Sequence, residues 1–111
     1  MSFFVKDNII TMTRGDTAKF PIEIKYLQNG RPYHPKETDI LRFTVKKYVS
    51  DKKPAIVKEI PASELMLVID PLDTKSLNFG QYHYDLELVR DNGEVETIIT
   101  DTMIEISPEV S

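Results

Sequence analysis

Residues 70–85, DPLDTKSLNFGQYHYD, are the most informative part of the sequence for the fold, because an acidic turn leads directly into a strand. The turn has room for a single helical turn, with Gly80 as its stop. Beyond Gly80, tyrosines alternate with polar residues, as a half-buried strand requires. We expect Tyr82 to bury its ring and to direct its hydroxyl back onto the upstream backbone, near Asp73 or Thr74.

The rest of the chain repeats this alternation in short segments separated by turn signals. All four glycines fall at reversals and none inside a strand: Gly15, Gly30, Gly80 and Gly93. We expect about eight strands, over 8–13, 17–26, 40–48, 55–60, 65–70, 81–90, 94–100 and 102–107. The corner at Tyr82 resembles that of immunoglobulin-like sandwiches. The sequence therefore predicts one all-β domain over residues 1–111, an antiparallel immunoglobulin-like β-sandwich of about seven to eight strands.

Two of these segments show clear inward and outward faces. In 17–26, every second residue is apolar, and Pro21 on the polar side predicts an edge strand or a bulge because proline cannot donate to a strand ladder. In 40–48 we expect three side chains to face the core: Leu41, Phe43 and Val45.

Other segments predict how the chain is connected. Residues 65–70 are apolar on both sides until Asp70, which indicates a central strand. Asn92-Gly93 is typical of a two-residue hairpin turn. Asn29-Gly30 also predicts a reversal, and the prolines that follow it indicate an irregular loop.

Arg14-Gly15-Asp16 matches the tripeptide that animal integrins bind at mobile loop tips. As a turn, Gly15 supplies a positive φ, while Asp16 and the Thr17 hydroxyl bond to the backbone nearby. As an adhesion signal, Arg14 and Asp16 would splay apart on an exposed tip. We predict a turn, because the tripeptide lies between two strands and such short motifs often arise by chance.

The composition excludes several classes of protein. The chain has 111 residues, of which 41% are hydrophobic and 29% charged, as in an ordinary globular domain. It has no cysteine, which excludes disulfides and thiolate metal sites. The N-terminal residues show no signal-peptide pattern, and no apolar run would span a membrane. We therefore expect synthesis in a cytoplasm and no membrane partner.

The charge is unevenly distributed along the chain. Residues 1–63 carry 12 Lys and Arg against 7 Asp and Glu, a balance of +5, and residues 64–111 carry 2 against 11, a balance of −9. The net charge of −4 argues against nucleic-acid binding. Two interpretations remain open: a dipole suited to head-to-tail contacts, or two mixed surfaces, which we favour.

No set of residues predicts catalysis, a cofactor or a metal. His34 and His83 have no second histidine at metal-ligand spacing. The acidic turns near Asp70 and at 91–94 lack a calcium-loop pattern. His83 could join Tyr82 and Tyr84 in a sugar-binding or catalytic group, but alternation places it on the opposite strand face. A lysine-rich stretch over 46–58 could meet an acidic partner, but its interruption by acidic residues favours a solvated hairpin.

Three stretches carry a family resemblance: NIITMTRGDTAKFPIEI (8–24), DILRFTVKK (39–47) and IDPLDTKSLNFGQYHYDLELVRDNGEVETIITDTMIEISPEV (69–110). They resemble small tail or baseplate-type proteins of phages and prophages of Gram-positive bacteria. They are also similar to the N-terminal immunoglobulin-like domain of baseplate upper proteins. The matching features are mostly turn and core residues: 14–17, 43–47, 73–85, 92–98 and 108–110.

The resemblance implies a non-catalytic assembly protein of a phage or prophage tail. Its partners would be other tail or baseplate proteins, with self-association as an open alternative, and its final location the virion tail. A second hypothesis is a carbohydrate- or cell-surface-binding module, since sandwiches often carry binding loops. The third, an enzyme, is the least favoured because the chain offers few candidate catalytic groups.

Overall fold

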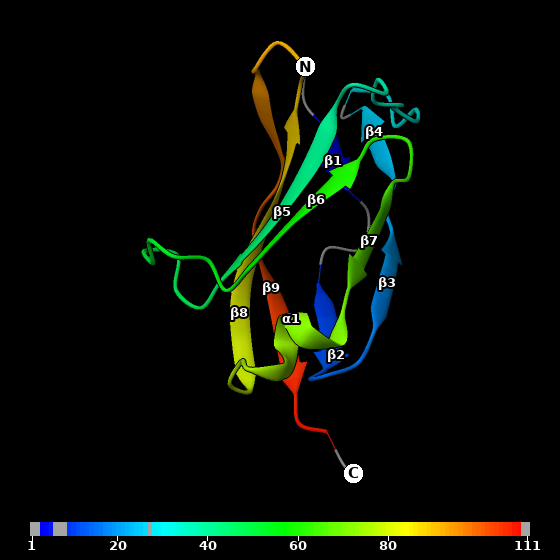
Figure 1. Cartoon of the computed structure of the whole chain (residues 1–111). Helices are drawn as coiled ribbons and strands as arrows, with labels where there is room; N and C mark the ends of the chain where they lie inside the picture. The colour runs from blue at the N-terminus through cyan, green and yellow to red at the C-terminus, as the bar shows by residue number, and fades with distance from the viewer. Residues whose placement is uncertain (1–2, 6–8, 27, 110–111) are drawn as a thin grey trace.

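The computed structural model describes residues 3–5, 9–26 and 28–109. Within these residues the chain forms nine strands and one short helix (Figure 1): β1 (Phe3–Val5), β2 (Ile10–Thr13), β3 (Ala18–Pro21), β4 (Ile24–Tyr26), β5 (Ile40–Lys46), β6 (Ile56–Pro61), β7 (Met66–Ile69), α1 (Pro71–Lys75), β8 (Gly80–Val89) and β9 (Val95–Ser107). The predicted all-β class is confirmed. Asn8 and Val110, which belong to predicted segments, lie outside the described residues.

The strands form two facing layers. One is a five-stranded sheet in the order β2-β9-β8-β5-β6, and the pairs β3-β7 and β1-β4 lie opposite it (Figure 1). The order β6-β5-β8-β9, with a corner tyrosine at the start of β8, is the arrangement of an immunoglobulin-like sandwich. The expected antiparallel pairing holds except between β2 and β9, which run parallel.

Residues 17–26 form two strands rather than the single one that the alternation predicts. β3 pairs with β7 and ends at Pro21, whereas β4 pairs with β1. Between them, the Ile22 amide donates to the Leu65 carbonyl oxygen at 2.8 Å. The edge position that Pro21 predicts is confirmed, since β3 has only β7 beside it in the described chain.

The expectation of a central strand at 65–70 is wrong. β7 pairs only with β3 among the described strands. Its side chains alternate, with Leu67 and Ile69 buried and Met66 exposed. An apolar run therefore does not mark a central strand here, because exposed apolar side chains on one face produce the same pattern.

The predicted strands 94–100 and 102–107 are one strand, β9. Its pairing with β8 shifts register on both sides of Leu86, so β9 carries extra residues there. One shift leaves Ile98 and Ile99 both buried, and the other leaves Asp101 with a positive φ of 32°. Alternation breaks at such β-bulges, which is why the sequence pattern indicates two strands.

Two predicted turns differ in detail. The turn between β8 and β9 has three residues, 91–93, rather than two, because the Arg90 amide closes it by donating to the Glu94 carbonyl at 2.8 Å, and Gly93 takes a φ of 90°. The helix ends at Lys75 rather than at Gly80, which begins β8 with a φ of 125°.

The core lies between the two layers and contains the expected inward residues of β5. Leu41, Phe43 and Val45 are at most 1% exposed. The Phe43 ring packs against Tyr84 with 5.2 Å between ring centroids. Phe20 packs at the margin of the same core and is half-buried.

Candidate functional site

The Arg14-Gly15-Asp16 tripeptide is the turn at which the chain crosses from β2 to β3, from one layer to the other. Gly15 has a φ of 82°, and its amide donates to the Thr74 hydroxyl at 2.8 Å. The predicted turn is confirmed, but its bonding differs. Thr74 of α1 supplies the side-chain oxygen, and no side-chain hydrogen bond of Asp16 or Thr17 occurs within the described residues.

The arginine of this turn is held in place from several sides. Its guanidinium pairs with the Glu109 carboxylate at 2.8 Å and donates to the Leu77 carbonyl at 3.3 Å. It also lies over the Phe79 ring, 4.2 Å from the centroid. Arg14 therefore connects the turn between β2 and β3 to the C-terminal segment at Glu109 and to the corner before β8.

The tyrosine corner is present, with a different partner from the one expected. Tyr82 is 4% exposed, and its hydroxyl donates to the Asn78 carbonyl at 2.8 Å rather than to the backbone near Asp73 or Thr74. Asp73 and Thr74 lie within α1, whereas Asn78 lies in the turn between α1 and β8. Lys47 covers the outer side of the ring, 4.6 Å from its centroid.

A shallow depression opens on the solvent side of the five-stranded sheet. Strand register places Thr44 opposite Asp85 and Lys46 opposite His83. The depression has a volume of about 140 Å³ and is lined by Thr44, Lys46, Val49, His83, Tyr84, Asp85 and Asp101. It therefore collects His83 and two carboxylates, whereas His34 lies in the loop after β4 and does not line the depression.

The β8–β9 bulge brings Asp101 into this depression. β8 has one residue, Asp85, where β9 has two, Thr100 and Asp101, between the paired positions on either side. Asp101 takes a left-handed backbone conformation, which costs energy for any residue other than glycine. Its carboxylate lies 2.6 Å from His83 Nδ1.

The depression has an unusual electrostatic feature at Asp85. Burial raises the pKa of the Asp85 carboxyl, and the charge of Lys46 opposes this shift. The Oδ1 atom of Asp85 is buried and has no hydrogen-bond partner in the described part of the chain. Sequence reasoning missed this group, because the bulge that gathers its neighbours leaves only a broken alternation as a signal.

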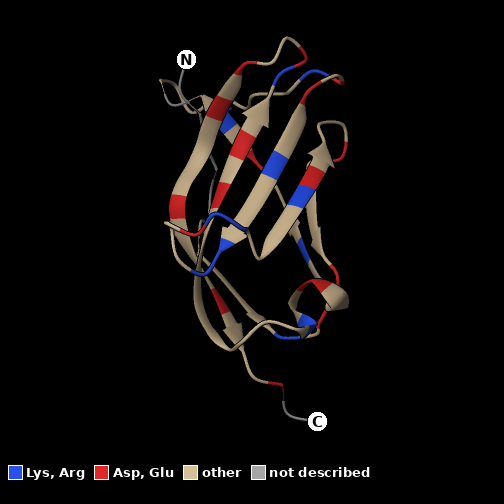
Figure 2. Cartoon of the chain, turned by 60° about the vertical axis from the view of Figure 1, so that its left-hand side comes forward, with Lys and Arg blue, Asp and Glu red and all other residues tan. Residues whose placement is uncertain are grey.

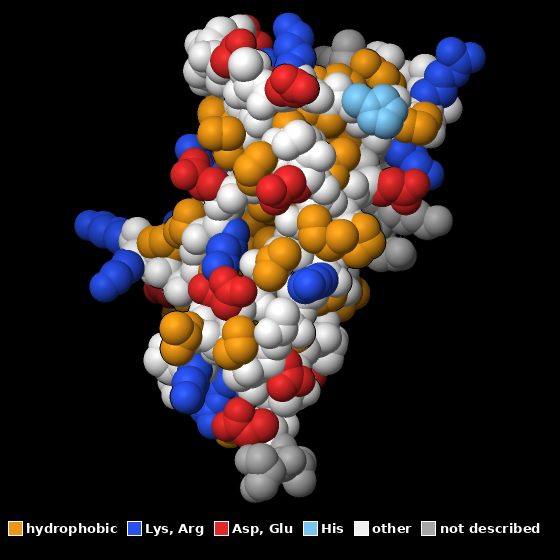
Figure 3. Space-filling view, turned by 45° about the vertical axis from the view of Figure 1, so that its right-hand side comes forward, with side chains coloured by type: hydrophobic (Ala, Val, Ile, Leu, Met, Phe, Trp, Pro, Cys, Tyr) orange, Lys and Arg blue, Asp and Glu red, His pale blue; other side chains and the backbone are white. Residues whose placement is uncertain are grey.

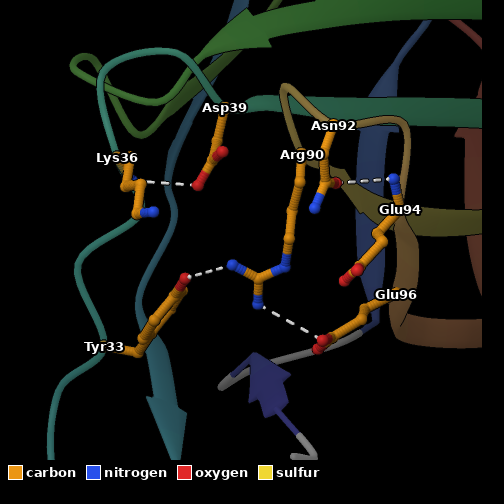
Figure 4. Close-up of polar contacts among 7 residues, drawn as sticks. All are labelled: Tyr33, Lys36, Asp39, Arg90, Asn92, Glu94 and Glu96. Atoms are coloured by element: carbon orange, nitrogen blue, oxygen red, sulfur yellow. Dashed lines mark hydrogen bonds and ion pairs between the residues drawn. The ribbon is translucent and has the colours of Figure 1, made fainter.

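A second polar cluster closes the sandwich at the β8–β9 hairpin (Figure 4). Arg90 donates to the Tyr33 hydroxyl at 3.1 Å and to Glu96 at 3.2 Å, and so joins the loop after β4 to β8 and β9. Asp39, which is 1% exposed, accepts a hydrogen bond from the Lys36 amide at 2.9 Å. These contacts link the two layers at this end of the molecule.

The remaining predicted candidates do not form a common site. Asp70 and Asp73 bind Lys58 at 3.2 and 2.7 Å, and no three metal-ligating side chains in the described residues are placed so that they could hold a metal ion together. Lys47 donates to the Gln81 carbonyl at 3.1 Å, whereas Lys52 and Lys53 are exposed. The lysine stretch is therefore divided among separate contacts.

The outer side of the five-stranded sheet also exposes a row of apolar residues. We define the outer apolar row as Pro61, Ile40, Val89 and Val95, which occupy one register on β6, β5, β8 and β9. Ile40 is 38% and Val95 49% exposed. Figure 2 shows this sheet with charges of both signs on neighbouring strands.

Comparisons with known proteins yield a similarity of shape alone. Searches for matching protein families and for related curated proteins return no match. The structure of murine CRIg is similar, with a TM-score of 0.45 and 12% sequence identity over 99% of this chain and 100% of that chain. This degree of likeness carries no information on function. No helix in the described residues is long and apolar enough to cross a membrane.

Proposed function

We propose that this chain is a non-catalytic structural protein of a phage or prophage tail, associated with the baseplate and acting through contacts with other tail proteins. The family resemblance of the turn and core motifs supports the tail assignment. The observation that supports a contact role is the outer apolar row, because neighbouring apolar side chains at one register form a continuous strip rather than isolated exposed residues.

The surroundings of the row resemble the rim of a protein interface. The next register on the sheet carries charge, with Arg42 3.7 Å from Glu87 and Glu59 opposite Arg42 on β6. Interfaces commonly combine an apolar centre with such a polar rim. Apolar side chains also reach the surface elsewhere, as Figure 3 shows for the face turned toward β3 and β7, but the outer apolar row follows one register across four strands.

Size-exclusion chromatography with light scattering tests this proposal on the protein alone and mixed with the tail proteins encoded beside it. We expect a complex with at least one of them. Ile40→Glu should weaken that complex, because it places a charge in the centre of the row. Leu72→Glu is the matched control, since Leu72 is 80% exposed on α1, outside the row.

Two results would contradict the proposal. One is a protein that stays monomeric with every neighbouring tail protein. The other is a complex that Leu72→Glu weakens as much as Ile40→Glu does, which would place the contact elsewhere. A gene neighbourhood of secretion and cell-wall genes would favour the cell-surface-binding alternative instead.

A further inference from the structure

The depression around His83 has no part in the proposed assembly role. It lies on the same face as the outer apolar row, but Thr44 is four residues further along β5 than Ile40. At roughly 3.3 Å per residue, this separates the two features by about 13 Å. A partner bound to the row could therefore leave the depression open.

The depression offers hydrogen-bond donors and acceptors side by side. The ammonium of Lys46 donates, the carboxylates of Asp85 and Asp101 accept, and the Thr44 hydroxyl and His83 imidazole can do either. Val49, which is 59% exposed, adds an apolar wall. The Lys46 ammonium offsets one of the two carboxylate charges, so the depression carries little net charge, which disfavours a strongly charged ligand.

The Oδ1 atom of Asp85, which has no partner among the described residues, indicates that the ligand would supply a hydrogen-bond donor. Buried polar atoms in proteins are nearly always hydrogen-bonded, either within the chain or to a bound molecule. No described residue donates to this atom. The Asp85 carboxyl lines the depression, so a donor that enters there meets a carboxyl with unused hydrogen-bonding capacity.

The backbone around the depression is also specialised. The bulge gives Asp101 a φ of 32° and holds its carboxylate 2.6 Å from His83 Nδ1. Bulges redirect side chains and are common beside binding sites. The strained residue is thus the one that presents a carboxylate to the depression.

We propose that this depression binds a neutral, hydroxyl-rich ligand, namely one saccharide unit. A sugar hydroxyl can donate to Asp85 or Asp101 while it accepts from Lys46, and the carbon face of the ring can contact Val49. The volume of about 140 Å³ is below the roughly 300 to 1,000 Å³ of sites for larger ligands, which indicates one ring rather than an enclosed chain.

Nuclear magnetic resonance on the full-length, ¹⁵N-labelled protein tests the site, with glucose, galactose and N-acetylglucosamine as probes. We expect saturable amide shifts from at least one of them, confined to residues 44–49, 83–85 and 100–102. Asp101→Gly should weaken the affinity on the order of tenfold, because it removes one charge-assisted hydrogen bond. Glycine tolerates the positive φ, so the bulge itself is kept.

Two further variants complete the design. Glu59→Gln is the control, since it removes a carboxylate from the same face but outside the depression, and the affinity should not change. His83→Gln is the second test variant, should Asp101→Gly fail to fold. His83 is exposed, so its replacement leaves the core intact while it removes the partner of Asp101.

Three outcomes would overturn the inference. The absence of shifts with all three sugars would mean that the depression holds only water. Shifts with inorganic phosphate or calcium chloride but not with sugars would mean an ion site. Sugar-dependent shifts near His34 or Asn92 alone would place binding on the loops. None of these results depends on whether the protein assembles with tail proteins.

Discussion

Single residues at the corner before β8 join segments that are far apart in the sequence. Arg14 reaches Glu109 and Leu77, and Thr74 accepts from the amide of Gly15. The corner tyrosine adds a local bond, from Tyr82 to the Asn78 carbonyl. Each contact is a side chain that satisfies a backbone group or a charge, which makes the corner testable one residue at a time.

Tyr82→Phe tests the corner without disturbing the core. The ring stays buried, and only the hydrogen bond of 2.8 Å to the Asn78 carbonyl is lost. We expect the free energy of unfolding to fall by about 1 kcal/mol, the usual net contribution of such a bond. Urea denaturation measures the change. An unchanged denaturation midpoint would show that the hydroxyl contributes nothing.

Gly15→Ala, compared with Gly30→Ala, separates backbone strain from crowding. Both glycines have positive φ, 82° and 70°, so each alanine should cost about 1 to 2 kcal/mol. A methyl group at Gly15 would lie 3.1 Å from Glu109 Oε2, whereas none of the chain lies within 4 Å at Gly30. We therefore expect the larger loss at Gly15, measured by urea denaturation. Equal losses would mean that the pair with Arg14 does not hold the Glu109 carboxylate in place beside Gly15.

The sequence predicts the residues of the corner better than their partners. Tyr82 and Gly15 are identified because a strand alternation and a positive φ are local properties. The partners Asn78 and Thr74 depend on how α1 packs beside the start of β8, which no local pattern encodes. The proximity of Asp85, Asp101 and His83 also depends on tertiary structure, because the β-bulge between β8 and β9 brings them together, and no local pattern predicts it.

At the scale of elements, the strand alternation fails where the chain changes layer or carries an extra residue. Pro21 ends β3 and leaves β4 to pair elsewhere, although the apolar alternation runs through both strands. In β9, extra residues opposite Leu86 reset the alternation without ending the strand. In both segments the hydrogen-bonding partners, rather than the order of side chains, determine the element.

The bulge in β9 should tolerate glycine and reject a β-branched residue at Asp101. Its φ of 32° is accessible to glycine but strained for valine, which should lower the free energy of unfolding by about 1 to 3 kcal/mol. Asp101→Gly should change it by less than about 0.5 kcal/mol, because the side chain is exposed. Thermal denaturation of both variants checks this, and a stable Asp101→Val would mean that the bulge relaxes freely.

The raised pKa of Asp85, a residue of β8 in the ladder with β9, predicts how the stability of the fold depends on pH. Because burial raises the pKa of its carboxyl, the folded state holds this proton more tightly than the unfolded chain does. The resulting stability is present at acidic pH and is lost as the pH rises through the raised pKa. Asp85→Asn should therefore gain stability relative to the wild type between pH 3 and pH 7, measured by urea denaturation. A relative loss over this interval would contradict the burial of the charge.

Across the whole molecule, the folded arrangement mixes the two oppositely charged halves of the sequence. β5 and β6 come from the basic half and β8 and β9 from the acidic half, yet they are neighbours in one sheet. Arg42 meets Glu87 within that sheet, and Lys58 of β6 meets Asp70 and Asp73 at α1. The strand order and these ion pairs therefore favour the mixed-surface interpretation over the dipole.

Lys58 connects these halves, and it also links the five-stranded sheet to the segment that follows β7. Its replacement should therefore lower the free energy of unfolding of the whole domain. The hydrogen bond to Asp73 raises the pKa of Lys58 above its usual 10.5, against the opposing effect of burial. This contribution is complete below pH 10.5 and is lost as the pH rises through the raised pKa. Lys58→Met should cost about 1 kcal/mol at pH 8, as expected for a partly exposed pair network.

Above pH 10.5, the difference between wild type and Lys58→Met should shrink in urea denaturation. Both proteins will lose stability there, because burial raises the pKa of Tyr84 to about 12 while tyrosines of the unfolded chain ionise near 10. That loss is common to the two proteins and cancels in the comparison. Lys53→Met is the control, since Lys53 is exposed, and it should match the wild type throughout. A Lys58→Met difference that stays constant from pH 8 to pH 11.5 would contradict a contribution from the charge of Lys58, and no difference at pH 8 would mean that the methylene chain, which methionine keeps, holds the two layers together.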